Sequence, residues 1–221
     1  MICIECAGPV ASLYTIYGEG NVRLTQCPQC TNFADKYVEH DLVIIAIDLI
    51  LIKPQVYRHL LFNLAPPQSS DDAMDGRMVR FGLMQLLFDV YLTWAQAERS
   101  GAHIAAGGVL WQYCTFLLLC VGQTLALHVS LRLLARWWLG WRRPNALSTA
   151  LFISSCIKLF PILMVIWAYD DVPAASRAVS WAVMVNNMEA LRILLGCEYW
   201  KAATLALVGS SLSILSLSTL S

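Results

Sequence analysis

The chain has 221 residues, of which 58% are hydrophobic and only 14% are charged, and its mean hydropathy is +0.59. These shares lie well outside those of an ordinary soluble domain, so the composition favours a membrane protein. Fifteen basic residues balance fifteen acidic ones. Because no overall positive field would attract nucleic acid, nucleic acid is not an expected partner.

The first residues, Met1–Cys6, contain neither a basic region nor an apolar stretch, so no cleavable signal peptide is expected. Membrane insertion would then use an internal segment. This arrangement places the N-terminal part most simply on the cytosolic side. In that reducing compartment, paired cysteines more often bind a metal than form disulfides.

Four cysteines form two pairs near the N-terminus, Cys3 with Cys6 and Cys27 with Cys30, separated by residues 7–26. This CxxC-x20-CxxC spacing lies at the upper edge of the range that indicates a zinc site. One tight turn can present both sulfurs of a pair to one ion, and four thiolates complete a tetrahedral shell without a position for water. The pattern therefore predicts one structural zinc ion. Four unrelated thiols or two disulfides are the alternative.

The segment between the cysteine pairs has the composition of a β-hairpin. Ser12–Tyr17 and Asn21–Thr25 are short β-prone runs, and Gly18–Asn21 between them is a turn-forming sequence. We therefore expect a zinc ribbon over residues 1–40. A unit of this size buries too little apolar surface to fold unaided, so the ion would supply much of the folding free energy.

Residues 41–64 are apolar but interrupted. Leu42–Ile52 contains one acid and is too short to span a bilayer as a helix, and Pro54 follows it. A single spanning helix over residues 42–64 would also bring several charged side chains into the hydrocarbon, each costing about 2.5–3.5 kcal/mol near its centre. We therefore expect two short amphipathic helices in the cytosolic interface, with Pro54 in the first turn of the second.

The second of these helices has an apolar stripe formed by Tyr57, Leu60, Leu61 and Leu64, which would face acyl chains or a partner helix. Two interpretations of its polar residues stay open. They form either a lipid-headgroup site or an interfacial anchor. The residues concerned are Lys53, Tyr57, Arg58, His59 and Asn63.

A polar linker is expected over residues 65–80, and a transmembrane helical body over residues 81–221. The expected fold is mainly α, an integral membrane bundle of about four to five spans with a small N-terminal β-hairpin zinc ribbon. Apolar stretches define the candidate spans. They are Phe81–Trp94, Val109–Leu131, Leu147–Tyr169, Val179–Leu195 and Ala202–Leu220. Arginines and tryptophans at 132–143 are suited to the cytosolic interface and set the orientation.

Four charged residues lie inside these candidate spans, namely Asp89, Lys158, Glu189 and Arg192. Charges in hydrocarbon are costly unless they are paired. They could form pairs between helices, and Glu189 and Arg192 are i,i+3 neighbours on one helix face. The alternative is a polar cavity for a lipid headgroup.

Five segments of the N-terminal region together resemble the Arv homology domain. They are Met1–Cys6, Leu13–Tyr14, Asn21–Cys30, Ala34–Glu39 and Ile47–Asn63. The resemblance is close over residues 1 to about 64, and beyond that it extends only to the presence of several membrane helices. Proteins of the Arv family are eukaryotic endoplasmic-reticulum membrane proteins implicated in sterol and sphingolipid homeostasis and in early glycosylphosphatidylinositol-anchor synthesis.

One detail departs from a common cysteine-knuckle pattern. Ala7 and Thr31 follow the second cysteine of each pair, where glycine often adopts a positive φ angle. We expect Gly8 and Asn32 to adopt that conformation one residue later.

The resemblance implies a non-enzymatic factor of the endoplasmic-reticulum membrane, with the Golgi as a further location. Its partners would be sterol, sphingolipid or a glycosylphosphatidylinositol precursor, together with subunits of lipid-synthesising enzymes. A membrane-embedded lipid or sugar transferase is one alternative, although the sequence has no His-x4-Asp, His-Glu-x2-His or glycine-rich phosphate motif. An accessory or docking subunit of a glycosylphosphatidylinositol-initiating complex is the other.

Overall fold

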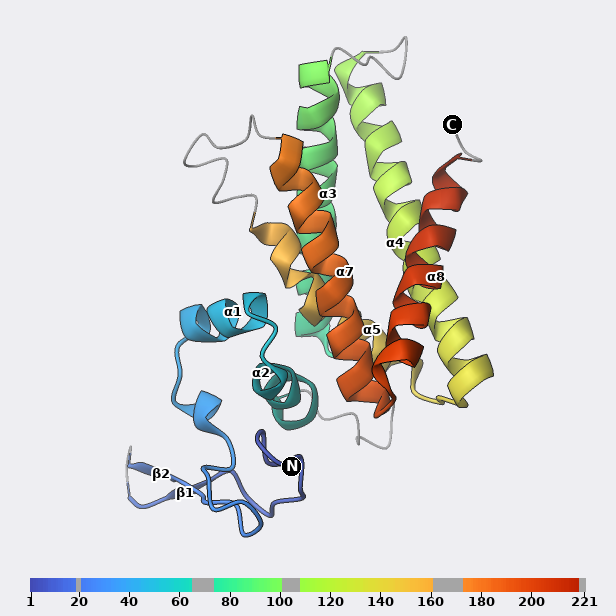
Figure 1. Cartoon of the computed structure of the whole chain (residues 1–221). Coiled ribbons are helices and arrows are strands. Elements are labelled where there is room, and N and C mark those ends of the chain that lie inside the picture. Colours follow the sequence, from blue (N-terminus) through green and yellow to red (C-terminus); the bar gives the residue numbers. More distant parts are fainter. Residues whose placement is uncertain (19–20, 65–73, 101–107, 161–172, 219–221) are drawn as a thin grey trace.

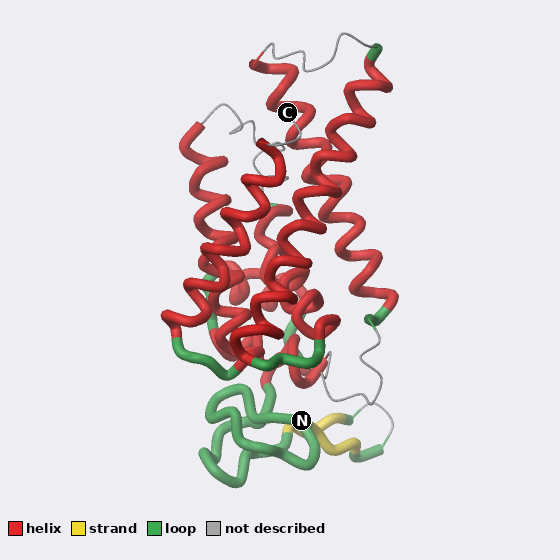
Figure 2. The backbone as a smooth tube through the Cα atoms, turned by 90° about the vertical axis from the view of Figure 1, so that its right-hand side faces the viewer, coloured by secondary structure: helices red, strands yellow, loops and turns green. Residues whose placement is uncertain are grey.

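The computed structural model describes residues 1–18, 21–64, 74–100, 108–160 and 173–218. For residues 99–100, 173–177 and 214–218 it describes the backbone only. A small N-terminal head lies at one end of a bundle of long helices (Figure 1). The strands lie at that end, and most of the described residues beyond the head are helical (Figure 2). This is the predicted mainly helical fold with a small hairpin.

The head contains a two-stranded antiparallel sheet. Strand β1 (Tyr14–Ile16) pairs with β2 (Val22–Leu24), with Tyr14 opposite Leu24. Gly18 adopts a φ of +80°, a conformation that costs glycine little, at the start of the connection between the strands. A short 3-10 helix, η1 (Lys36–Val38), ends the head. The predicted hairpin is confirmed, with shorter strands than the β-prone runs.

Two short helical segments connect the head to the body. Helix α1 (Leu42–Ile50) is followed by α2 (Pro54–Arg58), whose first turn begins with proline as expected. The chain continues directly into the π-helix η2 (His59–Leu64). Figure 1 shows α1 lying crosswise to the long helices, beside the body.

Helix α1 ends in a Schellman motif, in which the N–H groups of Lys53 and Ile52 donate to the carbonyls of Asp48 and Leu49 at 3.1 Å each. Such a motif needs a left-handed residue, usually glycine, but here Ile52 adopts a φ of +57°. A β-branched residue in this region is strained. The tight reversal turns the chain into α2.

In the described part of the body there are six helical segments. They are α3 (Gly76–Ser100), α4 (Val109–Leu139), α5 (Pro144–Ser154), the 3-10 helix η3 (Ser155–Leu159), α7 (Pro173–Leu195) and α8 (Tyr199–Ser218). Helix α8 packs along α4, and α7 packs against α5 and α8. The expected spans at 179–195 and 202–220 fall within α7 and α8, although residues 219–220 lie outside the described residues.

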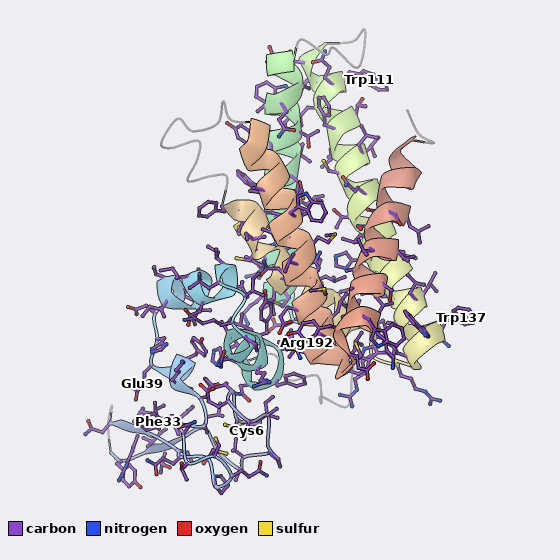
Figure 3. The ribbon with its side chains drawn as sticks, viewed as in Figure 1. Cys6, Phe33, Glu39, Trp111, Trp137 and Arg192 are labelled. Atoms are coloured by element: carbon purple, nitrogen blue, oxygen red, sulfur yellow. The ribbon has the colours of Figure 1, made fainter. Side chains whose placement is uncertain are left out.

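Among the described residues, α4 alone is both long and apolar enough to cross a membrane. Trp111 and Trp137 mark its two ends (Figure 3) and are 65% and 86% exposed. A helix rises about 1.5 Å per residue, so these rings are roughly 39 Å apart, close to the separation of the two interfaces of a bilayer. Helix α4 therefore has the length and composition expected of a membrane-spanning helix. The expected number of four to five spans stays a prediction.

The first helix of the body is longer than expected and begins inside the segment interpreted as a linker. The Asp75 side chain accepts a hydrogen bond from the backbone N–H of Arg77 at 2.9 Å, and the Asp75 carbonyl accepts from Met78 and Val79. These bonds satisfy N–H groups of the first turn, which is the role of a helix cap. An aspartate at position 75 was therefore the sequence signal that a helix begins at Gly76. Residues 65–73 of the expected linker lie outside the described residues.

The expected span at 147–169 is not one continuous α-helix in its described part. Helix α5 gives way to the tighter η3 at Ser155. Pro161 follows in the sequence, and proline removes a helical hydrogen bond and clashes with the preceding turn. Residues 161–169 of this expected span lie outside the described residues.

Head and body share one hydrophobic core. Buried Ile4 and Tyr37 from the head belong to the same cluster as Tyr57 and Leu61 from the connecting segments and Leu147 from α5. The predicted stripe on the second connecting helix therefore faces partner helices at Tyr57 and Leu61, whereas Leu64 is 49% exposed. The head is consequently packed on the body rather than tethered to it.

Close packing between α3 and α5 makes glycine necessary at position 82. A Cβ atom there would lie 2.6 Å from the Phe152 ring, whereas one at Gly122 on α4 would meet nothing within 4 Å. The Phe152 ring is itself held against His128, with centroids 4.7 Å apart. We predict that Gly82→Ala lowers stability by about 1–3 kcal/mol through overpacking, measured by thermal unfolding in detergent.

Gly122→Ala is the matched control, and its higher helix propensity should leave stability unchanged or raise it by up to about 1 kcal/mol. An equal rise in the melting temperature of both variants would contradict the packing of α3 on α5 described above.

Candidate metal centre and the clamp that joins it to the body

The four paired cysteines meet at one point of the head. The sulfurs of Cys3 and Cys30 are 3.7 Å apart, as are those of Cys6 and Cys27, and all four lie within 4.8 Å of one another. Zinc–thiolate bonds of about 2.3 Å give a tetrahedron with edges of about 3.8 Å. The four sulfurs are thus spaced to hold one metal ion, as the sequence predicted.

Both cysteine pairs lie in turns of the same design. The N–H of Ala7 donates to the carbonyl of Cys3, and the N–H of Thr31 donates to the carbonyl of Cys27, each at 3.0 Å. Ala7 and Thr31 themselves adopt φ values of +60° and +62°. The expectation that the following residues would take this conformation was therefore wrong, because each turn closes directly after its second cysteine.

Gly8 has a different role from the one expected. A Cβ atom at this position would lie 1.9 Å from the side-chain oxygen of Gln29 in the other knuckle. The two knuckles approach each other closely here, and a larger residue at this position would have to displace the end of the Gln29 side chain.

The backbone around Cys27 favours its thiolate form. The N–H groups of Cys30 and Gln29 lower the pKa of Cys27 to about 7, which helps it to act as a ligand at neutral pH. Ile4 and Tyr37 belong to the core shared with the body, so the separate hydrophobic cluster around the cysteines adds three buried apolar residues. They are Val10, Leu13 and Ala34, packed with Cys3 and Cys27. So small a core agrees with an ion that contributes to folding.

Three residues of the connecting segments form hydrogen bonds with the head, and we call them the clamp. They are Arg58, His59 and Asn63. The Arg58 guanidinium donates to the carbonyls of Ile4 and Glu5 at 2.7 Å each. These carbonyls belong to the first cysteine turn, so one charged side chain fixes the backbone beside two metal ligands.

Asn63 pairs with the backbone of Ile2 in both directions, as a neighbouring strand would. Its side-chain oxygen accepts from the N–H of Ile2 at 2.9 Å, and its nitrogen donates to the carbonyl of Ile2 at 3.0 Å. The start of the chain is thereby tied to a residue 61 positions later.

Asp35 of the head is the residue to which two members of the clamp bind, and it has no exposed surface. Its carboxylate binds the ring of His59 at 2.6 Å and accepts from Asn63 at 2.7 Å and from the N–H of Tyr37 at 3.0 Å. A buried carboxylate needs such partners because leaving it unpaired costs several kcal/mol. Sequence analysis did not single out Asp35. Its place directly before η1, as an N-cap, was the available signal.

Lys53 belongs to a second set of contacts, on α1. Its ammonium lies 2.6 Å from one oxygen of Asp48, and the Tyr37 hydroxyl donates to the other oxygen at 2.7 Å. Burial and the Asp48 carboxylate raise the pKa of Tyr37, so the hydroxyl stays a donor. These bonds join the end of the head to α1.

Tyr57 connects the clamp segment to the body. Its hydroxyl donates to the side-chain oxygen of Asn186 on α7, and both residues are fully buried. Burial raises the pKa of Tyr57, which keeps this donor protonated. All five residues considered for a headgroup site thus have partners inside the protein, and a direct contact of any of them with lipid stays a prediction.

The four charged residues that lie inside the candidate spans form two pairs. Lys158 of η3 lies 2.9 Å from Asp89 of α3, which joins two helices. Arg192 binds Glu189 on the same helix through two bonds, at 2.5 and 3.0 Å, and covers the Tyr199 ring at 4.3 Å. The structure therefore brings Asp89 and Lys158 together across the body, but it does not join them to the other pair.

Uncharged polar residues also link the helices, and sequence analysis missed them. Ser154 donates to buried Asn187 at 2.5 Å, which joins α5 to α7. The adjacent pair Asn186 and Asn187 inside an apolar stretch was the signal, because buried amides require partners.

We predict that Cys27→Ser lowers the metal content of the purified full chain from one ion to well below one, measured by plasma mass spectrometry. Loss of a thiolate opens the shell and removes the folding free energy that the ion supplies. Cys114→Ser, at an exposed cysteine on α4, is the control and should keep the ion. Full metal content in both variants would disprove the site.

We predict that Asn63→Ala destabilises the head by about 1–3 kcal/mol, because it leaves partly buried backbone groups of Ile2, and the buried Asp35 carboxylate, without the partner that Asn63 provides. Limited proteolysis of residues 1–64 should become several-fold faster. Gln55→Ala removes a partly exposed contact with Glu5 at 3.2 Å and should change the rate little. Equal rates for the two variants would show that the clamp does not hold the head.

The sequence of this chain is similar to those of known proteins. The model of the Arv1-like family matches residues 2–191, well beyond the N-terminal segments that carry the resemblance. Protein arv1 of Schizosaccharomyces pombe is 39% identical, over 95% of this chain and 81% of that protein. The Dictyostelium discoideum arv1 homolog is 31% identical over 95% and 90% of the two chains.

Protein ARV1 of Mus musculus is 32% identical over 87% of this chain and 73% of its own. No solved structure matches the chain significantly. The match of the family model to most of the chain, together with these relatives from fungi, an amoeba and a mammal, shows that the chain belongs to the Arv1-like family.

Proposed function

We propose that this chain is a non-enzymatic factor of the endoplasmic-reticulum membrane that mediates sterol and sphingolipid transport or distribution and supports glycosylphosphatidylinositol-anchor synthesis. The N-terminal head faces the cytosol, the body crosses the membrane several times, and the Golgi is a further location. Family membership supports this assignment through the functions expected of Arv proteins. We also propose that the metal is a single structural zinc ion, since four thiolates leave no open position for catalysis.

The observation that carries the proposal is the exposed apolar face of α1. Val43 is 68% exposed and Ile47 50%, and Leu51, directly after the helix, is 61% exposed. Contiguous apolar surface of this kind marks a membrane or interaction site. On the opposite side of α1, Asp48 and Leu49 are buried, and the bonds from Asp48 to Tyr37 and Lys53 fix the helix beside the head.

This placement gives the metal centre a mechanical role. The ion fixes the first cysteine turn, the clamp joins that turn to α2, and the Schellman turn at Ile52 sets the direction of α1. A helix that lies crosswise to the bundle (Figure 1) can rest in the headgroup region with its apolar face among acyl chains. The head thereby holds an apolar surface at the level where lipids enter and leave the bilayer.

The test is transfer of a fluorescent sterol from donor vesicles to acceptor vesicles, with the full chain reconstituted in the donors. Val43→Ser/Ile47→Ser should slow protein-dependent transfer several-fold, because it removes apolar surface from α1. Ile16→Ser/Val22→Ser is the matched control, since these hairpin residues are 65% and 44% exposed and lie away from the body. Transfer that does not depend on the protein, or equal slowing by both variants, would refute the proposal.

Two further measurements address the alternatives. Turnover of an activated sugar or acyl donor by the purified chain would favour a transferase. Co-purification with glycosylphosphatidylinositol-initiating enzymes, without any lipid transfer by the chain alone, would favour an accessory or docking subunit. The exposed Phe33 and the hollow it shares with Gln26 and Lys36 on the head are a surface that such an enzyme could contact.

A further inference from the structure

The turn between α4 and α5 contains a basic hollow that the proposed function does not use. It has a volume of about 510 Å³ and is lined by Arg136, Gly140 and Arg142. It lies at the end of α4 that carries Trp137, which is the end nearer the head (Figure 3). No acidic residue occurs in the sequence between Glu98 and Asp170, so the residues that flank the hollow in the sequence add no negative charge to it.

The end of α4 shapes this hollow. Gly140 follows the helix with a φ of +65°, and the N–H of Trp141 returns to the carbonyl of Ala135 at 3.1 Å. The indole N–H of Trp141 donates to the carbonyl of Arg143 at 2.8 Å, which pins the turn. A Cβ atom on Gly140 would meet nothing within 4 Å, so the space beside this backbone is open.

The two arginines that line the hollow are available for a ligand. Both are exposed, and in the described part of the chain neither guanidinium group makes a hydrogen bond or an ion pair. Other arginines are engaged, since Arg58 binds carbonyls and Arg77 and Arg192 bind carboxylates. Two unengaged guanidinium groups beside one hollow repel each other unless an anion lies between them.

A third arginine adds positive charge from one turn further into the body. Arg132 precedes Arg136 by four residues on α4, and its guanidinium is held by the Ser148 hydroxyl at 2.9 Å and the Asn145 amide oxygen at 3.0 Å. Both partners are neutral, so the charge of Arg132 is not cancelled. Its field reaches the hollow with less screening than a fully exposed charge would have.

We propose that this hollow binds the phosphate of an anionic membrane lipid between Arg136 and Arg142. The planar fork of arginine matches phosphate oxygens with two parallel bonds. Trp137, which is 86% exposed, lies beside Arg136 and places the site at headgroup depth. A lipid fits better than free phosphate because the acyl chains can lie along the apolar surface of α4, where Leu133 is 62% exposed. The inference does not rest on lipid transport.

The test is native mass spectrometry of the full chain in mild detergent, titrated with phosphatidic acid. Arg136→Gln/Arg142→Gln should weaken binding roughly 25-fold, which is about fivefold for each arginine lost near a membrane surface. Phosphatidylcholine binding should not change. Arg136→Lys/Arg142→Lys should lose less affinity, since ammonium groups keep the charge but cannot form the bidentate pair. It also serves as the second variant should the first fail to fold.

Arg23→Gln/Arg80→Gln is the charge-matched control. Arg80 lies at the start of α3, and Arg23 lies in β2. This control should weaken binding less than twofold. An equal loss in both double variants would mean that the arginines act only through general charge and would overturn the site. Displacement of the lipid by millimolar inorganic phosphate would overturn the choice of a lipid as ligand.

Discussion

The carboxylate of Asp35, buried without any contact with solvent, is the constraint on which the arrangement of head and body depends. Its bonds to His59 and Asn63 must both break before the ribbon can separate from the connecting helices, and loss of either partner in the folded chain would leave the buried carboxylate under-paired. Arg58 adds bonds to the first cysteine turn, and Tyr57, on the opposite side of the same segment, reaches Asn186 in the body. One short segment therefore joins the metal centre to the bundle.

Through these contacts the ribbon helps to fix the position of α1 relative to the body. Its separate hydrophobic cluster is small, so a metal ion held by the four cysteines would add rigidity to the part of the head on which the position of α1 depends. The strain at Ile52 belongs to the same system, because a left-handed isoleucine persists only where surrounding contacts fix the backbone. Here the bonds of Asp48 to Tyr37 and Lys53 provide that restraint.

Local pattern predicted several parts of the fold. The cysteine pairs, the hairpin and the start of α2 at Pro54 each depend on residues close together in sequence. The clamp could not be predicted in this way, because Asp35 and its partners lie 24 and 28 residues apart and follow no period. Likewise, hydropathy indicated where the body helices lie, but it could not show that α5 is followed by the 3-10 helix η3. Nor could it show that the Ser154 hydroxyl donates to Asn187.

The bond between Ile2 and Asn63 also imposes an order on biosynthesis. The four sulfurs can gather once Cys30 has been made, whereas the clamp must wait for Asn63, and Tyr57 finds Asn186 only after most of the chain exists. Metal loading can therefore precede docking of the head by much of the time needed for translation. Throughout that interval the side of α1 that carries Leu49, which is buried in the finished core, has no bundle beside it, so the nascent chain needs either the membrane surface or a chaperone to cover it.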